Sequence, residues 1–215
     1  MNRDFTNNLR KQYGIFGLER EDLSDNPMEM FKKWFQEALD ADIPEPNTMA
    51  LATVDKDGHP ANRIVLVKEI RDDGLVFFTN YKSRKGQDMA QNPNVSVLFF
   101  WQPLERQVRI EGKVERLSEE ESKEYFVTRP KGSQIGAWAS PQSRVIIDRS
   151  ELEDRVSELE KIYENRDTLP LPAHWGGYLV KAEYFEFWQG RSSRLHDRFE
   201  YRKENDGWEI NRLAP

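Results

Sequence analysis

Clustered cations, rather than a metal or nucleophile motif, are the residues of this sequence best suited to chemistry. Ser83 is a candidate helix N-cap, and Arg84 and Lys85 follow it directly. Two cations in a first helical turn oppose the helix dipole at a cost of about 0.3–1 kcal/mol each, whereas a bound phosphate would reverse that effect and would meet free N–H groups. The segment therefore indicates a phosphate site, with two ordinary surface cations as the alternative.

A second pair of cations, Arg63 and Lys68, flanks the apolar run Ile64-Val65-Leu66-Val67. Cations at the ends of an apolar strand can simply extend their head groups into water. Positions five apart also lie on opposite faces of a regular strand, so a shared ligand requires a bulge, two ligands or a site at a subunit interface. The pair is a candidate for ligand binding under that condition.

Tyr125, Arg129 and Ser133 form a third candidate cluster. Tyr125 and Arg129 are four residues apart at the end of a predicted helix, hence on one face, and Pro130 ends that helix so that Ser133 can fold back beside them. A phenol, a guanidinium and a hydroxyl that converge are well suited to hold a phosphate. The alternative is an arginine that only interacts with the dipole at a helix C-terminus.

A fourth cluster lies in the loop that follows an aromatic strand, from Trp188 to Arg198. Residues 191–198 include three arginines, one histidine and one aspartate. Loops positioned by a rigid scaffold often carry binding residues, and this composition favours an anionic or planar ligand. A surface network of Arg–Asp ion pairs is the alternative interpretation.

Several classes of protein are disfavoured by what the sequence lacks. It contains no G-x-G-x-x-G, P-loop, H-E-x-x-H or G-x-S-x-G motif, which weighs against Rossmann dehydrogenases, Walker-type nucleotide enzymes, zincins and α/β-hydrolases. There is no cysteine, and His59, His174 and His196 are far apart in the sequence, so we expect no metal site. Lys+Arg 32 against Asp+Glu 38 gives a net charge of -6, which weighs against a nucleic-acid module.

The absence of cysteine suits a protein of a reducing compartment. No N-terminal apolar stretch resembles a signal peptide, and the longest apolar run, 95–101, is far below the ~20 residues that span a bilayer. We expect a cytoplasmic protein with a single domain, residues 27–215, preceded by a mobile N-terminal arm, residues 1–26.

The four clusters must be positioned by a chain that combines many short strands with a few helices. Helical spacing and caps predict helices over 27–41, 83–91, 118–128 and 151–165. Apolar runs bounded by turn residues predict strands over 48–54, 61–70, 75–79, 95–101, 107–116, 177–188, 198–203 and 208–213. This order favours an α+β fold, mainly β with peripheral helices, in which a closed or nearly closed β-barrel has its helices outside.

Six separated segments, taken in chain order, match one known pattern. They are Arg63-Ile64-Val65-Leu66-Val67-Lys68, Phe78-Thr79-Asn80 with Ser83-Arg84-Lys85, Leu104-Glu105-Arg106-Gln107-Val108, Ser133-Gln134-Ile135-Gly136-Ala137-Trp138, Glu186-Phe187-Trp188-Gln189-Gly190 and Arg194-Leu195-His196-Asp197-Arg198. The series closely resembles the pyridoxamine 5'-phosphate oxidase family over nearly the whole chain. Any one segment is modest evidence, whereas six in order are highly specific.

The resemblance implies an FMN-binding split β-barrel that works as a homodimer with FMN at the subunit interface, which would meet the condition set above for Arg63 and Lys68. It implies FMN contacts from Arg63, Ile64, Val65, Leu66, Val67, Lys68, Phe78, Thr79, Arg84, Lys85, Gln107, Gln142, Ser143, Trp188 and Arg198. It implies substrate contacts from Lys68, Tyr125, Arg129, Ser133, Arg194 and His196, with Arg10 and Tyr13 of the arm as further contacts.

The implied reaction is the FMN-dependent oxidation of pyridoxamine or pyridoxine 5'-phosphate to pyridoxal 5'-phosphate, with O2 reduced to hydrogen peroxide. Two phosphates would account for two basic clusters, and Arg194 and His196 would be the catalytic residues over the reacting ring. We expect a neutral His196 beside Arg194, orienting the substrate rather than acting as an obligatory base. A split-barrel FMN reductase with a different substrate and a non-catalytic pyridoxal phosphate carrier are the alternatives.

Overall fold

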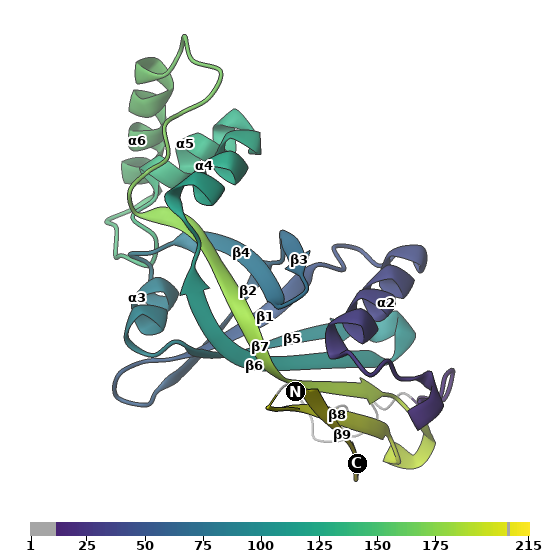
Figure 1. Ribbon diagram of the computed structural model, residues 1–215. Coiled ribbons are helices and arrows are strands. Elements are labelled where there is room, and N and C mark those ends of the chain that lie inside the picture. The colour runs from purple at the N-terminus through teal and green to yellow at the C-terminus, as the bar shows by residue number, and fades with distance from the viewer. Residues whose placement is uncertain (1–11, 206) are drawn as a thin grey trace, which may run out of the picture. The chain divides into compact units, whose positions relative to one another are not determined.

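The computed structural model describes residues 12–205 and 207–215, which form nine strands and five α-helices (Figure 1). The strands are β1 (Thr48–Val54), β2 (Pro60–Leu66), β3 (Glu69–Arg71), β4 (Gly74–Asn80), β5 (Asn94–Trp101), β6 (Arg106–Arg116), β7 (Trp175–Gln189), β8 (Asp197–Glu204) and β9 (Gly207–Leu213). The helices are α2 (Pro27–Asp40), α3 (Arg84–Gln91), α4 (Glu119–Thr128), α5 (Lys131–Ala139) and α6 (Arg149–Ile162), with short 3-10 turns η1 (Arg20–Asp22), η2 (Gln102–Leu104) and η3 (Ser192–Arg194).

The strands belong to one sheet in the order β2-β1-β5-β6-β7-β4-β3, and β8 joins β7 to β9. The pairs β3–β4, β4–β7, β7–β8 and β8–β9 are antiparallel. Within this order the chain forms two compact units, one of residues 1–50, 97–111 and 182–215 and the other of residues 51–96 and 112–181. We call them unit 1 and unit 2.

In unit 1, helix α2 covers a core of aromatic side chains. Asn26 caps the helix by accepting a hydrogen bond from the N–H of Met28 at 2.8 Å, and Pro27 occupies the first turn, where no N–H is needed. The buried face of α2 includes Trp34, whose ring meets Phe187 of β7 edge-on with 5.2 Å between ring centroids. The predicted amphipathic helix is therefore confirmed.

In unit 2, helices α4, α5 and α6 lie beside one another (Figure 1). Ser118 and Glu121 form the predicted capping box: the Ser118 hydroxyl accepts from the N–H of Glu121 at 3.1 Å, and the Glu121 carboxylate accepts from the N–H of Ser118 at 3.0 Å. These helices and β7 enclose a small core of Phe126, Ile135, Leu169 and Trp175.

The structure differs from the prediction at one strand and at one additional helix. The strand predicted over 61–70 is interrupted, because β2 ends at Leu66 and β3 begins at Glu69, and the N–H of Lys68 donates to the carbonyl of Val76 at 2.8 Å. The helix α5 was not predicted, because Pro130 suggested only the end of the preceding helix. Pro130 is in fact the N-cap of α5, a place where its missing N–H costs nothing.

No helix among residues 12–205 and 207–215 is long and apolar enough to cross a membrane.

Candidate functional site

The residues implicated by the sequence fall into two sets, one in each unit. Unit 2 contains Arg63, Ile64, Val65, Leu66, Val67, Lys68, Phe78, Thr79, Arg84, Lys85, Tyr125, Arg129, Ser133, Gln142 and Ser143. Unit 1 contains Tyr13, Gln107, Trp188, Arg194, His196 and Arg198. Arg10 lies outside the described residues.

The predicted phosphate turn is the N-terminus of α3. Ser83 caps it, with its hydroxyl accepting from the N–H of Gly86 at 3.3 Å, and Arg84 and Lys85 occupy the first turn as predicted. Gly86 is required by packing, because a Cβ there would lie 2.6 Å from the Tyr81 carbonyl carbon. The turn therefore presents two cations on a tightly packed backbone.

Lys85 is surrounded by neutral oxygens. Its ammonium donates to Gln142 Oε1 at 2.7 Å, to Thr79 Oγ1 at 3.1 Å and to Ser83 Oγ at 3.3 Å. Burial, with a smaller contribution from the charge of Arg63, lowers the pKa of Lys85 to about 8. A bound anion would supply the negative charge that these neutral oxygens do not.

Arg63 points toward the same helix from β2. Its Nη1 donates to Thr53 Oγ1 at 2.8 Å and to the Leu51 carbonyl at 3.0 Å, while its Nη2 lies 3.8 Å from Asp88 Oδ2. Burial lowers the pKa of Arg63, the Asp88 carboxylate opposes this effect, and the charge of Arg84 adds to it. Arg63, Arg84 and Lys85 therefore form one group of mutually repelling cations, which favours an anionic ligand.

A second cationic position in unit 2 lies against a stack of aromatic rings. Phe78, Tyr125 and Trp175 stack nearly parallel, with 4.0 Å between the centroids of Phe78 and Tyr125 and 5.4 Å between those of Phe78 and Trp175. The Arg129 guanidinium lies 4.7 Å from the Trp175 centroid. Its Nη1 is buried and has no hydrogen-bond partner among the residues that the structure describes, and burial lowers the pKa of Arg129.

The unpaired Nη1 atom of Arg129 points to a ligand, because a buried cationic donor without an acceptor costs about 1–3 kcal/mol or more. Arg129 is the C-cap of α4 and Pro130 the N-cap of α5, so Ser133 lies in the first turn of the next helix at the same corner. Lys68 is exposed in the break between β2 and β3. The predicted cluster of Tyr125, Arg129 and Ser133 thus comes from two helices rather than from one helix and a loop.

In unit 1, three rings from β7, the following loop and the N-terminal arm lie together. The Trp188 and His196 centroids are 4.5 Å apart, and the Tyr13 ring lies 5.9 Å from that of Trp188 and 6.1 Å from that of His196. Arg194 ends η3 with a left-handed backbone, φ 63°, directly after Ser193 with φ 56°. Two consecutive left-handed residues are costly and are typical of functional loops.

The protonation of His196 is set by a backbone contact. The N–H of Arg191 donates to Nδ1 of His196 at 3.0 Å, which places the proton of the neutral ring on Nε2. Burial and then the charge of Arg194 lower the pKa of His196, while Asp197 opposes them. His196 therefore offers an N–H donor at Nε2 rather than a free basic nitrogen.

Arg198 is held in place by two acceptors. Its Nε donates to Glu186 Oε1 at 2.8 Å and its Nη1 donates to the Ala214 carbonyl at 2.8 Å, and the hydrogen bond to Glu186 raises the pKa of Arg198. Glu186 also meets Arg109 Nη2 at 2.8 Å.

Two residues of this set, Glu186 and Arg191, were not assigned a role from the sequence. Glu186 could have been found, because it is two residues from Trp188 and therefore shares its strand face.

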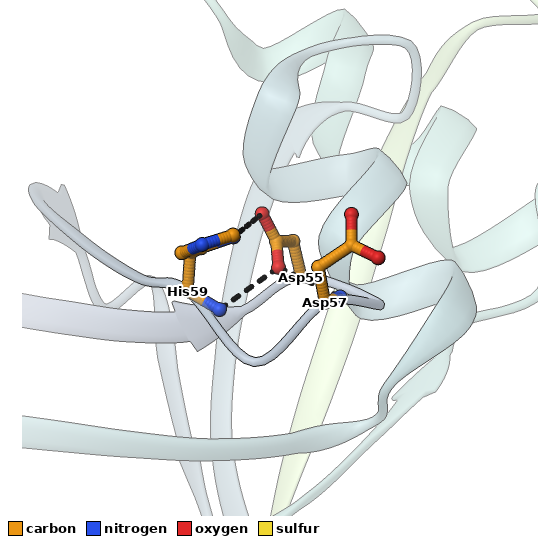
Figure 2. Close-up of side chains that lie close together, drawn as sticks. All are labelled: Asp55, Asp57 and His59. Atoms are coloured by element: carbon orange, nitrogen blue, oxygen red, sulfur yellow. Dashed lines mark hydrogen bonds and ion pairs between the residues drawn. The ribbon is translucent and has the colours of Figure 1, made fainter.

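Asp55, Asp57 and His59 are brought together in the turn between β1 and β2 (Figure 2). One oxygen of Asp55 accepts from the N–H groups of Asp57 and His59, both at 2.9 Å, and the other lies 3.3 Å from His59 Nδ1. These hydrogen bonds are those of an aspartate-stabilised turn. The turn therefore accounts for the cluster without a metal ion.

Comparison with known proteins shows the same architecture and sequence pattern. Residues 35–163 match the family model described as pyridoxamine 5'-phosphate oxidase, and residues 175–215 match the pyridoxine 5'-phosphate oxidase C-terminal dimerisation region. Proteins named pyridoxine/pyridoxamine 5'-phosphate oxidase from Salinibacter ruber and Paraburkholderia phytofirmans are 53% and 54% identical, each over 96% of this chain and 97% of the relative. The structure of PhzG from Burkholderia lata 383 with tetrahydrophenazine-1-carboxylic acid matches with a TM-score of 0.88 and 30% identity, over 95% of this chain and 100% of that one.

The mainly antiparallel fold with peripheral helices is thus the split β-barrel expected from the sequence, and the molecule is an oxidoreductase of that class. The chain belongs to the pyridoxine/pyridoxamine 5'-phosphate oxidase family. It carries that family's C-terminal dimerisation region.

Proposed function

We propose that this chain oxidises pyridoxamine 5'-phosphate and pyridoxine 5'-phosphate to pyridoxal 5'-phosphate, with FMN as cofactor and O2 as the final electron acceptor, which leaves as hydrogen peroxide. The observation that carries the proposal is the buried Nη1 of Arg129 beside Tyr125 and Trp175, which has no hydrogen-bond partner among residues 12–205 and 207–215 and is a cationic position additional to the group of Arg63, Arg84 and Lys85. A phosphorylated substrate and a phosphorylated cofactor need two such positions.

The residues present fit FMN. The α3 N-terminus with Arg84 and Lys85 suits the phosphate, and the neutral oxygens around Lys85 leave its charge available to that phosphate. Trp188, Arg198 and Gln107 of unit 1 supply an aromatic face, a fixed cation and an amide for the ring system. FMN, when bound, supplies the two-electron redox chemistry that no side chain of this protein provides.

The protein's own task is to hold the substrate. In the proposal Arg129, Tyr125, Ser133 and Lys68 bind its phosphate, so that the ring is oriented from its phosphate end. Arg194 and His196 hold the ring in the proposal, and the neutral His196 donates a hydrogen bond through its Nε2–H rather than accepting the substrate's proton. The amine or alcohol proton leaves to water, because the Nδ1 atom of His196 is occupied by Arg191.

We further propose that the protein is a homodimer with FMN at the subunit interface. The match of residues 175–215 to a dimerisation region supports the dimer. That region contains Trp188, Arg194, His196 and Arg198, so residues proposed to bind cofactor and substrate belong to the segment that would meet the partner. A site at this interface would also allow Arg63 of β2 and Lys68, which lies in the break after β2, to bind ligands on different faces.

The structural similarity to PhzG raises a second candidate function, the oxidation of an unphosphorylated ring acid, because the structure of that relative is a complex with tetrahydrophenazine-1-carboxylic acid. Arg129 favours the phosphorylated substrate, since its buried Nη1 has no hydrogen-bond partner among the described residues and adds a cationic position to the group at α3. A split-barrel reductase would need only the FMN residues, and a carrier of pyridoxal phosphate would need no flavin. Purified protein that is yellow and forms pyridoxal 5'-phosphate from pyridoxamine 5'-phosphate in air supports the oxidase, whereas colourless protein that only binds pyridoxal 5'-phosphate supports the carrier.

Replacing Arg129 by alanine is expected to raise KM for pyridoxamine 5'-phosphate at least tenfold, because a charge-assisted hydrogen bond to phosphate contributes about 1.5–3 kcal/mol. Tyr125→Phe should raise KM less, since it removes one neutral donor and keeps the stack on Phe78. Steady-state kinetics and the flavin content of the purified variants are the measurements. Loss of flavin in either variant would show that the cluster binds FMN rather than the substrate.

FMN binding is expected to weaken as the pH rises above about 8. The pKa of Lys85 is about 8 in the free protein, and a phosphate beside the ammonium must raise it. Above pH 8, FMN binding is then accompanied by the uptake of one proton. The Kd should therefore rise with pH, with a slope that approaches about tenfold per pH unit. Calorimetric titration of the apoprotein measures this, and Lys85→Arg, which stays charged, should flatten the profile. A pH-independent Kd for the unmodified protein would contradict the role of Lys85.

A further inference from the structure

We propose that Glu105 is a positioning residue that fastens the N-terminal arm beside the substrate ring, an inference that rests on the proposed function. Glu105 is only 1% exposed, and its Oε2 accepts hydrogen bonds from the N–H groups of Gly14 at 2.8 Å and Ile15 at 3.3 Å. A buried carboxylate is costly unless its oxygens are hydrogen-bonded. The arm's amides therefore stabilise the buried carboxylate, and the carboxylate in turn fixes the arm.

The backbone of Glu105 is fixed as firmly as its side chain. It has left-handed dihedrals, φ 56° and ψ 39°, at the end of η2. Its carbonyl accepts from the N–H of Gly190 at 2.7 Å and from Gln189 Nε2 at 3.2 Å. A long side chain in this region persists only when its surroundings impose the conformation. Glu105 is thus a rigid anchor between the arm and the end of β7.

The anchor determines where Tyr13 lies. Tyr13 directly precedes the fastened Gly14, and its ring contacts those of Trp188 and His196. The backbone is packed without spare room, because a Cβ on Gly190 would lie 2.9 Å from the Cβ atoms of both Tyr13 and Glu105. Releasing Gly14 from Glu105 would therefore release Tyr13 from the ring cluster.

The other end of this stretch is held by a second buried carboxylate. Asp197 Oδ2 accepts from the N–H of Leu18 at 3.1 Å, next to His196 in the chain. Between the two anchors Ile15 and Phe16 are 61% and 42% exposed. Little apolar burial holds residues 14–16. Phe16 is held separately, because its carbonyl accepts from Arg191 Nη1 at 3.4 Å and its ring lies 5.5 Å from the Arg106 guanidinium, whereas the N–H groups of Gly14 and Ile15 are held by Glu105.

The first test is a double-mutant cycle in the FMN-loaded enzyme. Glu105→Ala is expected to raise KM for pyridoxamine 5'-phosphate about tenfold while flavin content stays near that of the unmodified protein. If Glu105 acts through Tyr13, then Tyr13→Ala should have little further effect in the Glu105→Ala background, although it raises KM alone. Fully additive effects of the two substitutions would overturn the proposal.

The second test needs no activity. Hydrogen exchange of the FMN-loaded protein, followed by mass spectrometry, should show residues 13–16 exchanging about tenfold or more faster in Glu105→Ala. Glu209→Ala, at an exposed glutamate of β9, is the matched control and should leave this exchange unchanged. Glu105→Gln keeps the volume and serves if the alanine variant does not fold, and it should also accelerate exchange. Unchanged exchange overturns the anchor, whereas absent oxidation by the unmodified protein overturns only the proposed function.

Discussion

Replacing Arg84 and Lys85 together by alanine is expected to weaken FMN binding at least a hundredfold. Each cation should contribute about 1.5–3 kcal/mol through charge-assisted hydrogen bonds to the phosphate, so the pair contributes about 3 kcal/mol or more. Both lie in the first turn of α3, and among the described residues the hydrogen-bond partners of Lys85 are neutral oxygens. Calorimetric titration of FMN into the apoprotein measures the loss.

The fold should survive this double substitution. In the free protein the two cations oppose the α3 dipole, so the free energy of unfolding should stay constant or rise slightly without them. Lys32→Ala with Lys33→Ala, on the exposed side of α2, removes the same charge elsewhere and is the matched control. Unchanged FMN affinity in the Arg84/Lys85 variant, or equal losses in both variants, would refute a phosphate site at α3.

Arg194→Ala is expected to lower kcat/KM for pyridoxamine 5'-phosphate by about a hundredfold or more, because in the proposed function Arg194 orients the substrate ring at the reacting position. Arg194→Lys should restore little of this loss, since an ammonium cannot reproduce the planar two-point contact of a guanidinium. Alanine and lysine both carry a Cβ and meet the same strain at the positive φ of this position, 63°, so the comparison of the two variants isolates the head group.

His196→Gln serves as the contrasting variant at the same site. A glutamine can place an N–H donor near the position of Nε2, so flavin reduction should stay within about tenfold of the unmodified rate, whereas loss of a general base costs about 10²–10⁴-fold. Rapid mixing without O2 measures this step alone. Abolished reduction in a variant that still binds substrate would make His196 a base and would contradict the orienting role.

The local parts of the site could be predicted from the sequence because they depend on neighbours along the chain. Ser83 as a cap and Arg84 and Lys85 in the first turn follow from helix geometry, and so does the place of Arg129 at the end of the helix that carries Tyr125. The resemblance then supplied the split-barrel fold and the family, and both are confirmed. The single-domain boundary at residue 27 and the ligand assignments of individual residues remain predictions.

The remaining features depend on contacts between distant parts of the chain. Glu105 meets Gly14 across 91 positions, and no local pattern marks that pair. The interruption of the predicted 61–70 strand is set by the pairing of Lys68 with Val76 in the neighbouring strand. The tautomer of His196 depends on the backbone N–H of Arg191, five residues earlier, which no residue pattern places beside the imidazole. Sequence periodicity contains none of this information.

The proposed oxidation is tested by mixing the purified, FMN-loaded protein with pyridoxamine 5'-phosphate in the absence of O2 while recording the flavin absorbance. We expect the oxidised flavin band to disappear and one pyridoxal 5'-phosphate to form for each flavin, and we expect O2, once admitted, to restore the band and yield hydrogen peroxide. A flavin that remains oxidised, with substrate bound and unchanged, would contradict the proposed oxidation.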